Sequence, residues 1–245
     1  MYSKEKYAVT MGDSVYYSLR KNIMDLNLKP GEAINVKEIS EQLGVSRSPV
    51  RDSLIKLEKE GLITTIPKKG TIVSKIDLKR VKEERFLRRC LEEKVIILFA
   101  KHSIDSDVTE LKNKIKMQQE SIDKNDMKSF LEYDNQYHEV FFRVANKMLC
   151  WEAVKNMSGH YGRVRTMTLW NGKTVHYVIE QHELFLKFIM DKDIEELKKL
   201  TEIHLTQQSK EEIVLIEQYP DFFESDIDDN ENVGFLKKDF LEMMR

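Results

Sequence analysis

Cysteine, proline and glycine are scarce in this sequence, with 2, 4 and 9 of them among 245 residues. The two cysteines, Cys90 and Cys150, lack CxxC spacing, which excludes a disulfide framework and a cysteine-based zinc site, and we expect both to be buried thiols. So few helix-breaking residues, in a chain with 33% charged residues, favour a helical globular protein over a disordered or collagen-like one.

Long hydrophobic runs are also absent. The longest wholly apolar run, Val95 to Ala100, is far shorter than the roughly 18–20 residues that cross a bilayer. Lys4, Glu5 and Lys6 occupy the region where a secretory signal would be apolar. The sequence therefore predicts a cytoplasmic protein with no membrane partner.

The net charge of −2 is unevenly distributed. Residues 1–76 carry 13 Lys and Arg against 9 Asp and Glu, whereas residues 219–245 carry 3 against 8. A basic N-terminal part on a near-neutral body is typical of a protein that contacts nucleic acid with one part only.

This basic part has the pattern of a helix-turn-helix. An apolar stripe predicts a first helix that ends before Pro30, and Asn35 is placed to cap a short second helix whose inner face is Ile39 and Leu43. Residues 44–46, Gly-Val-Ser, form a tight turn in which the serine can cap a third helix.

The third helix is followed by a predicted hairpin. Arg47 and Arg51 are four residues apart and project from the same face near the start of the helix. Two β-prone runs, residues 62–66 and 71–73, flank the basic turn 67–70. This order of elements predicts a winged helix-turn-helix.

The stretch from Leu28 to Val73 resembles the GntR family of bacterial transcription regulators. The resemblance is carried by Val45-Ser46-Arg47-Ser48-Pro49-Val50-Arg51, by Leu57-Glu58-Lys59-Glu60-Gly61-Leu62 and by Lys69-Gly70. It implies that the third helix enters the major groove of double-stranded operator DNA and that the tip of the wing reaches the minor groove. The DNA-contacting positions that it implies are Lys37, Ser46, Arg47, Ser48, Arg51, Lys68, Lys69 and Gly70. Arginine is more usual at the first of these, and lysine keeps the charge for a phosphate but loses the bidentate fork that reads guanine.

After a connector at residues 74–77, in which Asp77 can cap a helix, the pattern predicts an all-helical antiparallel bundle. The expected helices cover residues 78–102, 105–123, 125–146, 148–158, 174–190 and 194–219. The fold class is thus mainly α. The predicted domains are a DNA-binding domain at 8–76, a helical effector-binding and dimerisation domain at 77–218, and an acidic C-terminal extension at 219–245 without an assigned function.

Several polar side chains lie on the inward stripes of the predicted helices. They are Arg88, Asp134, His138, His182 and His204. Each buried polar group without a partner would cost about 1–3 kcal/mol, so something must satisfy them. Three imidazoles and one carboxylate suit Zn²⁺, Ni²⁺ or Mn²⁺, and the alternative is a hydrogen-bonded core cluster without metal.

Residues 78 to about 210 resemble the helical FCD effector domain found in the fatty-acid-regulator branch of the GntR family. The similar segments are Arg88-Arg89-Cys90-Leu91-Glu92, Asp134-Asn135-Gln136-Tyr137-His138, Gln181-His182-Glu183 and Thr201-Glu202-Ile203-His204-Leu205. The resemblance implies that Asp134, His138, His182 and His204 bind a divalent metal and that Arg88 holds a carboxylate effector. His176 is close enough in sequence to line the same pocket.

The sequence therefore predicts a ligand-responsive repressor that binds a palindromic operator as a homodimer and responds to a small organic acid. Two alternatives remain on the same helical fold, namely a metal-dependent enzyme and a metal sensor without an organic effector. We expect no enzyme, because no nucleophile motif, general base or glycine-rich cofactor loop is found in the sequence.

Overall fold

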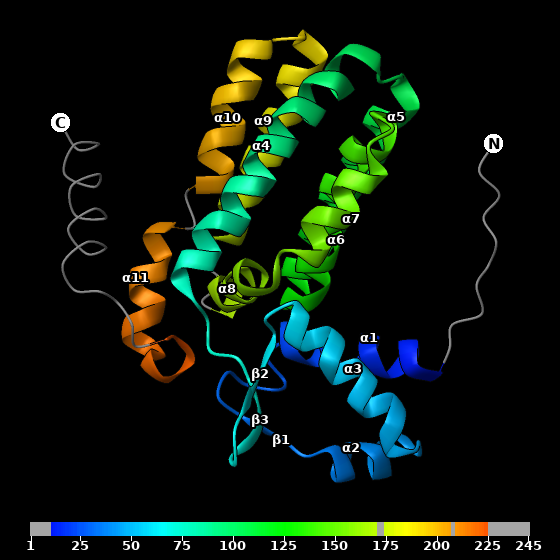
Figure 1. Cartoon of the computed structure of the whole chain (residues 1–245). Coiled ribbons are helices and arrows are strands. Elements are labelled where there is room, and N and C mark those ends of the chain that lie inside the picture. Colours follow the sequence, from blue (N-terminus) through cyan, green and yellow to red (C-terminus); the bar gives the residue numbers. More distant parts are fainter. Residues whose placement is uncertain (1–10, 171–173, 207–208, 225–245) are drawn as a thin grey trace.

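A computed structural model describes residues 11–170, 174–206 and 209–224 (Figure 1). Its elements in chain order are α1 Met11–Met24, β1 Ala33–Ile34, α2 Val36–Leu43, α3 Arg47–Lys59, β2 Ile63–Ile66, β3 Gly70–Val73, α4 Leu78–His102, α5 Asp105–Asp123, α6 Met127–Val144, α7 Met148–Asn156, α8 Gly159–Trp170, α9 Val175–Asp191, α10 Ile194–Thr206, α11 Ser209–Gln218 and a 3-10 turn Pro220–Phe222. The predicted class is confirmed, since a winged helix-turn-helix precedes an all-helical domain. Within the described residues, no helix combines the length and the apolar character needed to span a membrane.

The winged-helix domain is built on the packing of α1 against α3. The two helices bury Val15, Leu19, Ile23, Val50, Leu54 and Leu57 together. β2 and β3 form the predicted hairpin, paired antiparallel from Ile63 opposite Val73 to Ile66 opposite Gly70. The sequence did not predict β1, whose two residues pair with β3 and are too few to show an alternating pattern.

The turn between α2 and α3 forms largely as predicted. The Asn35 side chain accepts hydrogen bonds from two backbone N–H groups at the start of α2, and Gly44 ends this helix in the left-handed conformation, with φ of +64°. Ser46 occupies the cap position of α3, but its side chain makes no capping bond. Leu43, predicted to face the core, is exposed, because the inner face of this short helix is Ile39 and Ser40.

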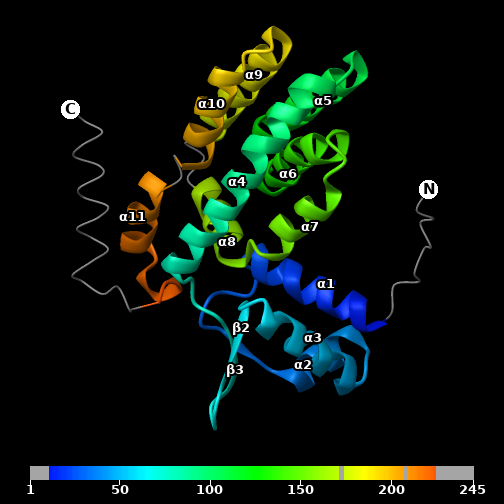
Figure 2. The same ribbon diagram turned by 45° about the horizontal axis from the view of Figure 1, so that its top comes forward.

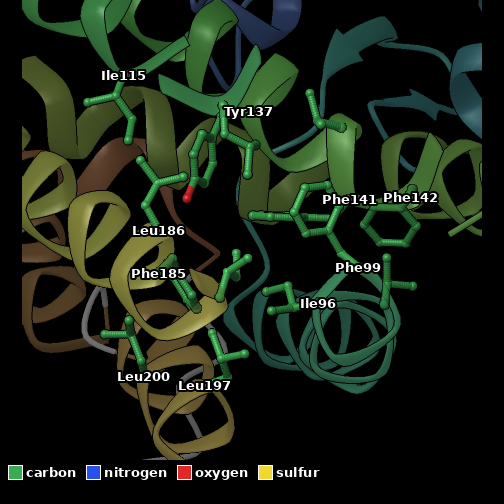
Figure 3. Packing of buried hydrophobic residues seen from close by; sticks show 14 of the residues in the cluster. Ile96, Phe99, Ile115, Tyr137, Phe141, Phe142, Phe185, Leu186, Leu197 and Leu200 are labelled. Atoms are coloured by element: carbon green, nitrogen blue, oxygen red, sulfur yellow. The ribbon is translucent and has the colours of Figure 1, made fainter. Parts of the chain in front are cut away.

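The helical domain encloses a second core. Figure 3 shows aromatic and aliphatic side chains of α4, α6, α9 and α10 meeting in its centre. Phe99 of α4 contacts Phe141 of α6 edge to face, with 5.1 Å between ring centroids. Such pairs stabilise a core beyond simple burial, and this packed core surrounds the inward polar residues.

Three predictions about the helical region were wrong, and one helix, expected at approximately 125–146, is two residues shorter at each end. The sequence did not predict α8, because this helix is buried on nearly all sides and has no apolar stripe. The helix expected at 125–146 is shorter because Asn125 and Asn146 adopt left-handed conformations, and the helix expected at 194–219 consists of α10 and α11. Cys90 is exposed and Cys150 only half-buried, so neither is a buried thiol.

Helix α8 joins the two domains (Figures 1 and 2). Its Gly162 lies so close to α1 that a Cβ atom there would be 2.4 Å from Met24 Cε. Thr166 Oγ1 donates to the Met24 carbonyl oxygen at 3.0 Å, and Arg163 Nη1 donates to the carbonyl oxygen of Ser74 in the connector at 2.6 Å. A displacement of α8 would therefore be felt by the winged-helix domain.

Residues 225–245 of the acidic extension lie outside the described residues, so the prediction of a separate segment at 219–245 stays untested there. The described start of this segment packs on the connector, where Phe222 and Phe223 lie against Ile76.

Candidate functional site

Three histidines from three helices meet inside the helical domain. His138 of α6, His182 of α9 and His204 of α10 are all buried, and one ring nitrogen from each lies within 4.8 Å of the other two. The Nε2 atoms of His138 and His204 are 3.2 Å apart.

An oxygen atom beside Nδ1 orients each of the three rings. The pairs are His138 with Glu92 Oε2 at 3.0 Å, His182 with Gln118 Oε1 at 2.9 Å and His204 with Gln181 Oε1 at 2.8 Å. Since such oxygens only accept, His182 and His204 carry their protons on Nδ1 and leave a lone pair on Nε2, whereas His138 Nδ1 approaches Glu92 Oε2 without a hydrogen bond. Partners of this kind are what metal-binding histidines generally have behind them.

The electrostatics of the triad also keep its rings uncharged. Burial lowers the pKa of His138, His182 and His204 well below the ordinary histidine value, and the guanidinium groups of Arg88 and Arg165 contribute to this lowering at His138 and His182. Neutral imidazoles are the form that binds a metal ion.

Asp134 lies at the edge of the triad, one helical turn before His138. Its Oδ1 is 3.6 Å from His182 Nε2 and its Oδ2 is 3.9 Å from His138 Nε2. The carboxylate is paired with the Arg165 guanidinium of α8. Burial acts to raise the pKa of Asp134, but this guanidinium and the nearby positive charges hold that pKa below its usual range.

Arg88 is buried beside the triad but is not free. Its Nε donates to Glu92 Oε1 at 2.6 Å, and the other oxygen of this carboxylate faces His138. The Arg88 Nη2 atom is buried without a hydrogen-bond partner among the described residues. Arg88, Glu92, Asp134 and Arg165 thus form two buried ion pairs around three neutral rings.

The donor set fits a divalent metal. The Nε2 atoms of His138 and His204, 3.2 Å apart, are close enough to share a proton or to bind one cation, and His182 Nε2 is buried without a hydrogen-bond partner among the described residues. Imidazole nitrogen with one carboxylate oxygen suits Zn²⁺, Ni²⁺ or Mn²⁺. The structure thus brings three of the four predicted ligands into one cluster, while Asp134 lies at its edge and is paired with Arg165.

Sequence reasoning missed four residues around the triad, namely Glu92, Gln118, Arg165 and Gln181. Glu92 follows Arg88 by four residues, and this spacing on a helix is a signal for an ion pair. No sequence pattern indicated that Arg165 belongs to the site, because its helix was not predicted. His176, expected to line the pocket, is exposed at the start of α9 and lies outside the triad.

The residues predicted to contact DNA are all exposed on the winged-helix domain. They are Lys37, Ser46, Arg47, Ser48, Arg51, Lys68, Lys69 and Gly70. α2, the start of α3 and the tip of the hairpin lie at the end of the molecule away from the helical domain (Figure 1). Lys68 and Gly70 have φ of +63° and +105°, which lets the hairpin reverse tightly and present its lysines.

Two family models match this chain. Residues 11–73 match bacterial regulatory proteins of the gntR family, and residues 85–207 match the FCD domain.

Curated relatives are also transcription regulators. The chain is 26% identical over 213 residues to the HTH-type transcriptional repressor RspR of Escherichia coli strain K12, covering 87% of this chain and 93% of the relative. It is 28% identical over 189 residues to the gluconate operon transcriptional repressor of Bacillus subtilis strain 168, covering 74% and 76%.

Solved structures share the fold. McbR/YncC of E. coli superposes with a TM-score of 0.72 at 22% identity, covering 86% of this chain and all of that one. A GntR regulator from Rhodococcus sp. RHA1 superposes with a TM-score of 0.68 at 18% identity, covering 81% and 96%.

Proposed function

Since this chain belongs to the gntR family of bacterial regulatory proteins and carries an FCD domain, we propose that it is a cytoplasmic repressor whose operator binding is controlled by a small carboxylate. Its relatives and both of its domains are those of regulators, so the prediction that it is not an enzyme is confirmed and the metal-dependent enzyme is set aside. Two relatives are named repressors, which supports the sign of regulation proposed.

The DNA-binding half of the proposal is a homodimer on a palindromic operator. One recognition helix reads only a few base pairs, so two are needed for useful specificity. Ser46, Arg47, Ser48 and Arg51 contact the major groove, Lys37 a phosphate, and Lys68, Lys69 and Gly70 the minor groove. The exposure of all eight residues supports this assignment.

The regulatory half of the proposal is a divalent metal held by Asp134, His138, His182 and His204. The convergence of three buried ring nitrogens within 4.8 Å of one another, with His182 Nε2 left without a hydrogen-bond partner among the described residues, carries this assignment. Two ion pairs already balance the buried charges, so a divalent cation leaves two positive charges in excess. A carboxylate effector reaching Arg88 and the metal would balance one of them, and the unpartnered Arg88 Nη2 offers it a donor.

A metal sensor without an organic effector is the second candidate. One observation favours it, because Arg88 is already paired with a carboxylate, that of Glu92. The two candidates differ in what changes operator affinity. In the first, Zn²⁺, Ni²⁺ or Mn²⁺ needs an added acid, whereas in the second the metal alone is sufficient.

Metal binding is tested by chelation and by substitution. Removing a metal present at about a hundred times its Kd should lower the stability by about 2.7 kcal/mol and the melting temperature by about 5–10 °C. His182→Ala should abolish this response, whereas exposed His176→Ala should retain it. If purified protein contains no metal and added ions leave the melting temperature unchanged, the triad is a hydrogen-bonded core cluster.

The effector is tested by calorimetry with small mono- and dicarboxylates and sugar acids on metal-loaded protein. Binding to the wild type that weakens in Arg88→Ala supports the proposal. Equal affinity in that variant, or no binding of any acid to the wild type, contradicts it.

A further inference from the structure

A cleft of about 700 Å³ lies between the two domains. α1 of the winged-helix domain forms one wall, and α6, α7 and α8 of the helical domain form the other walls. Figure 2 shows one end of α1 beneath α7 and α8 at this junction. The cleft thus differs from the histidine triad, whose rings come from α6, α9 and α10 and do not line it.

Two buried guanidinium groups line the cleft, those of Arg88 and Arg165. Arg88 Nη2 has no hydrogen-bond partner among the described residues, and neither does Nε1 of Trp151, which also lines the cleft. Both atoms only donate hydrogen bonds. Two buried donors without an acceptor, beside two cations, call for a group that accepts and is negatively charged.

The remaining lining combines apolar with polar side chains, and apart from the two buried arginines it carries four cationic residues against three acidic ones. Val154 and Leu169 line the cleft from the helical domain, and Met24 and Tyr17 line it from α1. Among the lining residues, six are cationic and three acidic. An anion with an apolar body matches this combination better than a sugar acid or a short dicarboxylate does.

We propose that the cleft between α1 and helices α6–α8 binds an organic acid with an apolar chain or ring, its carboxylate on Arg88 and Arg165 and its body against α1. The inference rests on the proposed function in that the effector uses Arg88, and it adds a second domain to the site. In this proposal the lining of the cleft, and not the metal, selects which class of organic acid binds.

The position of the cleft explains how a bound ligand would affect the DNA-binding surface. α1 packs directly on the recognition helix α3. Across the rim, Lys128 Nζ of α6 lies 2.5 Å from Asp25 Oδ2, and Arg20 Nη2 of α1 donates to the Lys155 carbonyl oxygen at 2.8 Å. A ligand held between the two walls would fix or separate these contacts and so change how α3 is presented.

The same ligand would also act on the metal site. Arg165 lines the cleft and pairs with Asp134. A carboxylate that draws this guanidinium toward the cleft would leave Asp134 more available to a cation. Acid and metal would then bind with positive coupling.

The test uses tryptophan fluorescence of the full chain, because both of its tryptophans, Trp151 and Trp170, line the cleft. The probes are octanoate and cyclohexanecarboxylate, with 1-octanol as the match without charge and succinate as the match without an apolar body. We expect a saturable change with one or both apolar acids, and binding at least tenfold weaker for 1-octanol and succinate. No saturable change with either apolar acid, or equal affinity for 1-octanol, overturns the proposal.

A variant of the α1 wall separates this proposal from the proposed function. Tyr17 is largely exposed and lies far from the triad in the fold, so Tyr17→Glu should leave metal binding and folding unchanged. Its negative charge should weaken the apolar acid about tenfold, whereas Tyr17→Phe should bind normally. Equal binding by both variants overturns the cleft site even if metal and small acids bind as proposed. Binding of the apolar acid to chelated protein, with loss in Tyr17→Glu, supports the cleft even if the metal proposal fails.

Discussion

The winged-helix domain and the helical domain carry their candidate functional residues in opposite ways. In the first, Arg47 and Arg51 project into solvent from one helix, and local signals such as the Asn35 cap and the Gly44 turn place that helix. In the second, His138, His182 and His204 are buried and each depends on a partner from another helix. An exposed binding surface can therefore be inferred from a short stretch of sequence, whereas a buried site depends on contacts between distant segments.

Helix α8 contacts both the buried site and the winged-helix domain that carries the exposed surface. Its Arg165 pairs with Asp134 at the triad, and its Arg163 and Thr166 bind the connector and α1. One twelve-residue helix thus connects the buried site with the exposed one. A route of packed and hydrogen-bonded contacts of this kind can carry coupling between an effector site and a DNA-binding surface.

The largest expected effect is that of a substitution in the exposed surface on DNA binding. Arg51→Ala should weaken operator binding by about 1–3 kcal/mol at each of two half-sites, because the base contact that we propose for Arg51 would be lost from both chains of the proposed dimer. The melting temperature and the metal content should be unchanged. Gel-shift or fluorescence titration with an operator duplex measures the operator affinity. Normal operator affinity in this variant would contradict the proposal that α3 is the helix that contacts DNA.

The next largest effect concerns the buried ion pair. Arg165→Met should destabilise the metal-free protein by about 3–5 kcal/mol, because Asp134 is left as a buried charge without its partner. A divalent metal should restore much of this loss by pairing with the same carboxylate. Arg143→Met is the matched control, since the Arg143–Glu110 pair is exposed and should contribute at most about 1 kcal/mol.

Denaturant titration of both variants, with and without metal, makes the measurement. An equal loss with and without metal would show that Asp134 is not a ligand. An equal loss of stability in the Arg165 and Arg143 variants would show that the buried ion pair contributes no more to the free energy of unfolding than the exposed one.

The sequence specified the fold well where the signals were local. The Asp77 cap, the hairpin turn at 67–70 and the inward stripe of α6 are all present as predicted. It failed on α8, because a helix buried on all sides has no amphipathic period to detect. The four ligand positions were inferred from inward stripes, but the pairing of Arg88 with Glu92 and of Asp134 with Arg165 depends on rotamers and packing that no single stripe records.

A smaller effect is expected in the pH dependence of the domain junction. Glu84 accepts hydrogen bonds from the backbone N–H groups of His160 and Tyr161 at the start of α8, and Arg80 and Arg163 lie nearby. Burial raises the pKa of Glu84 from 4.5 to about 7. The folded protein then binds more protons than the unfolded chain between these values, so stability falls as pH rises from about 4.5 to 7.

Glu84→Gln should remove this part of the pH dependence, on the order of 1–3 kcal/mol across the window, because an amide still accepts from the helix but does not ionise. Unfolding curves at pH 4.5, 6 and 7.5 compare the variant with the wild type. Parallel pH profiles for the two proteins would contradict the role of Glu84.

The smallest expected effect is the difference in stability between substitutions at two helix starts, Asp77 before α4 and Ser46 before α3. Asp77 accepts hydrogen bonds from two backbone N–H groups at the start of α4, so Asp77→Ala should cost about 1 kcal/mol of stability. Ser46 occupies the same position before α3 but makes no side-chain capping bond, so Ser46→Ala should change stability by less than about 0.5 kcal/mol. Its hydroxyl is instead available to the operator, and Ser46→Ala should weaken DNA binding several-fold, by about 1 kcal/mol per chain at most. A stability loss in Ser46→Ala as large as that in Asp77→Ala, with operator affinity unchanged, would mean that Ser46 is a structural cap and that the exposed surface begins at Arg47.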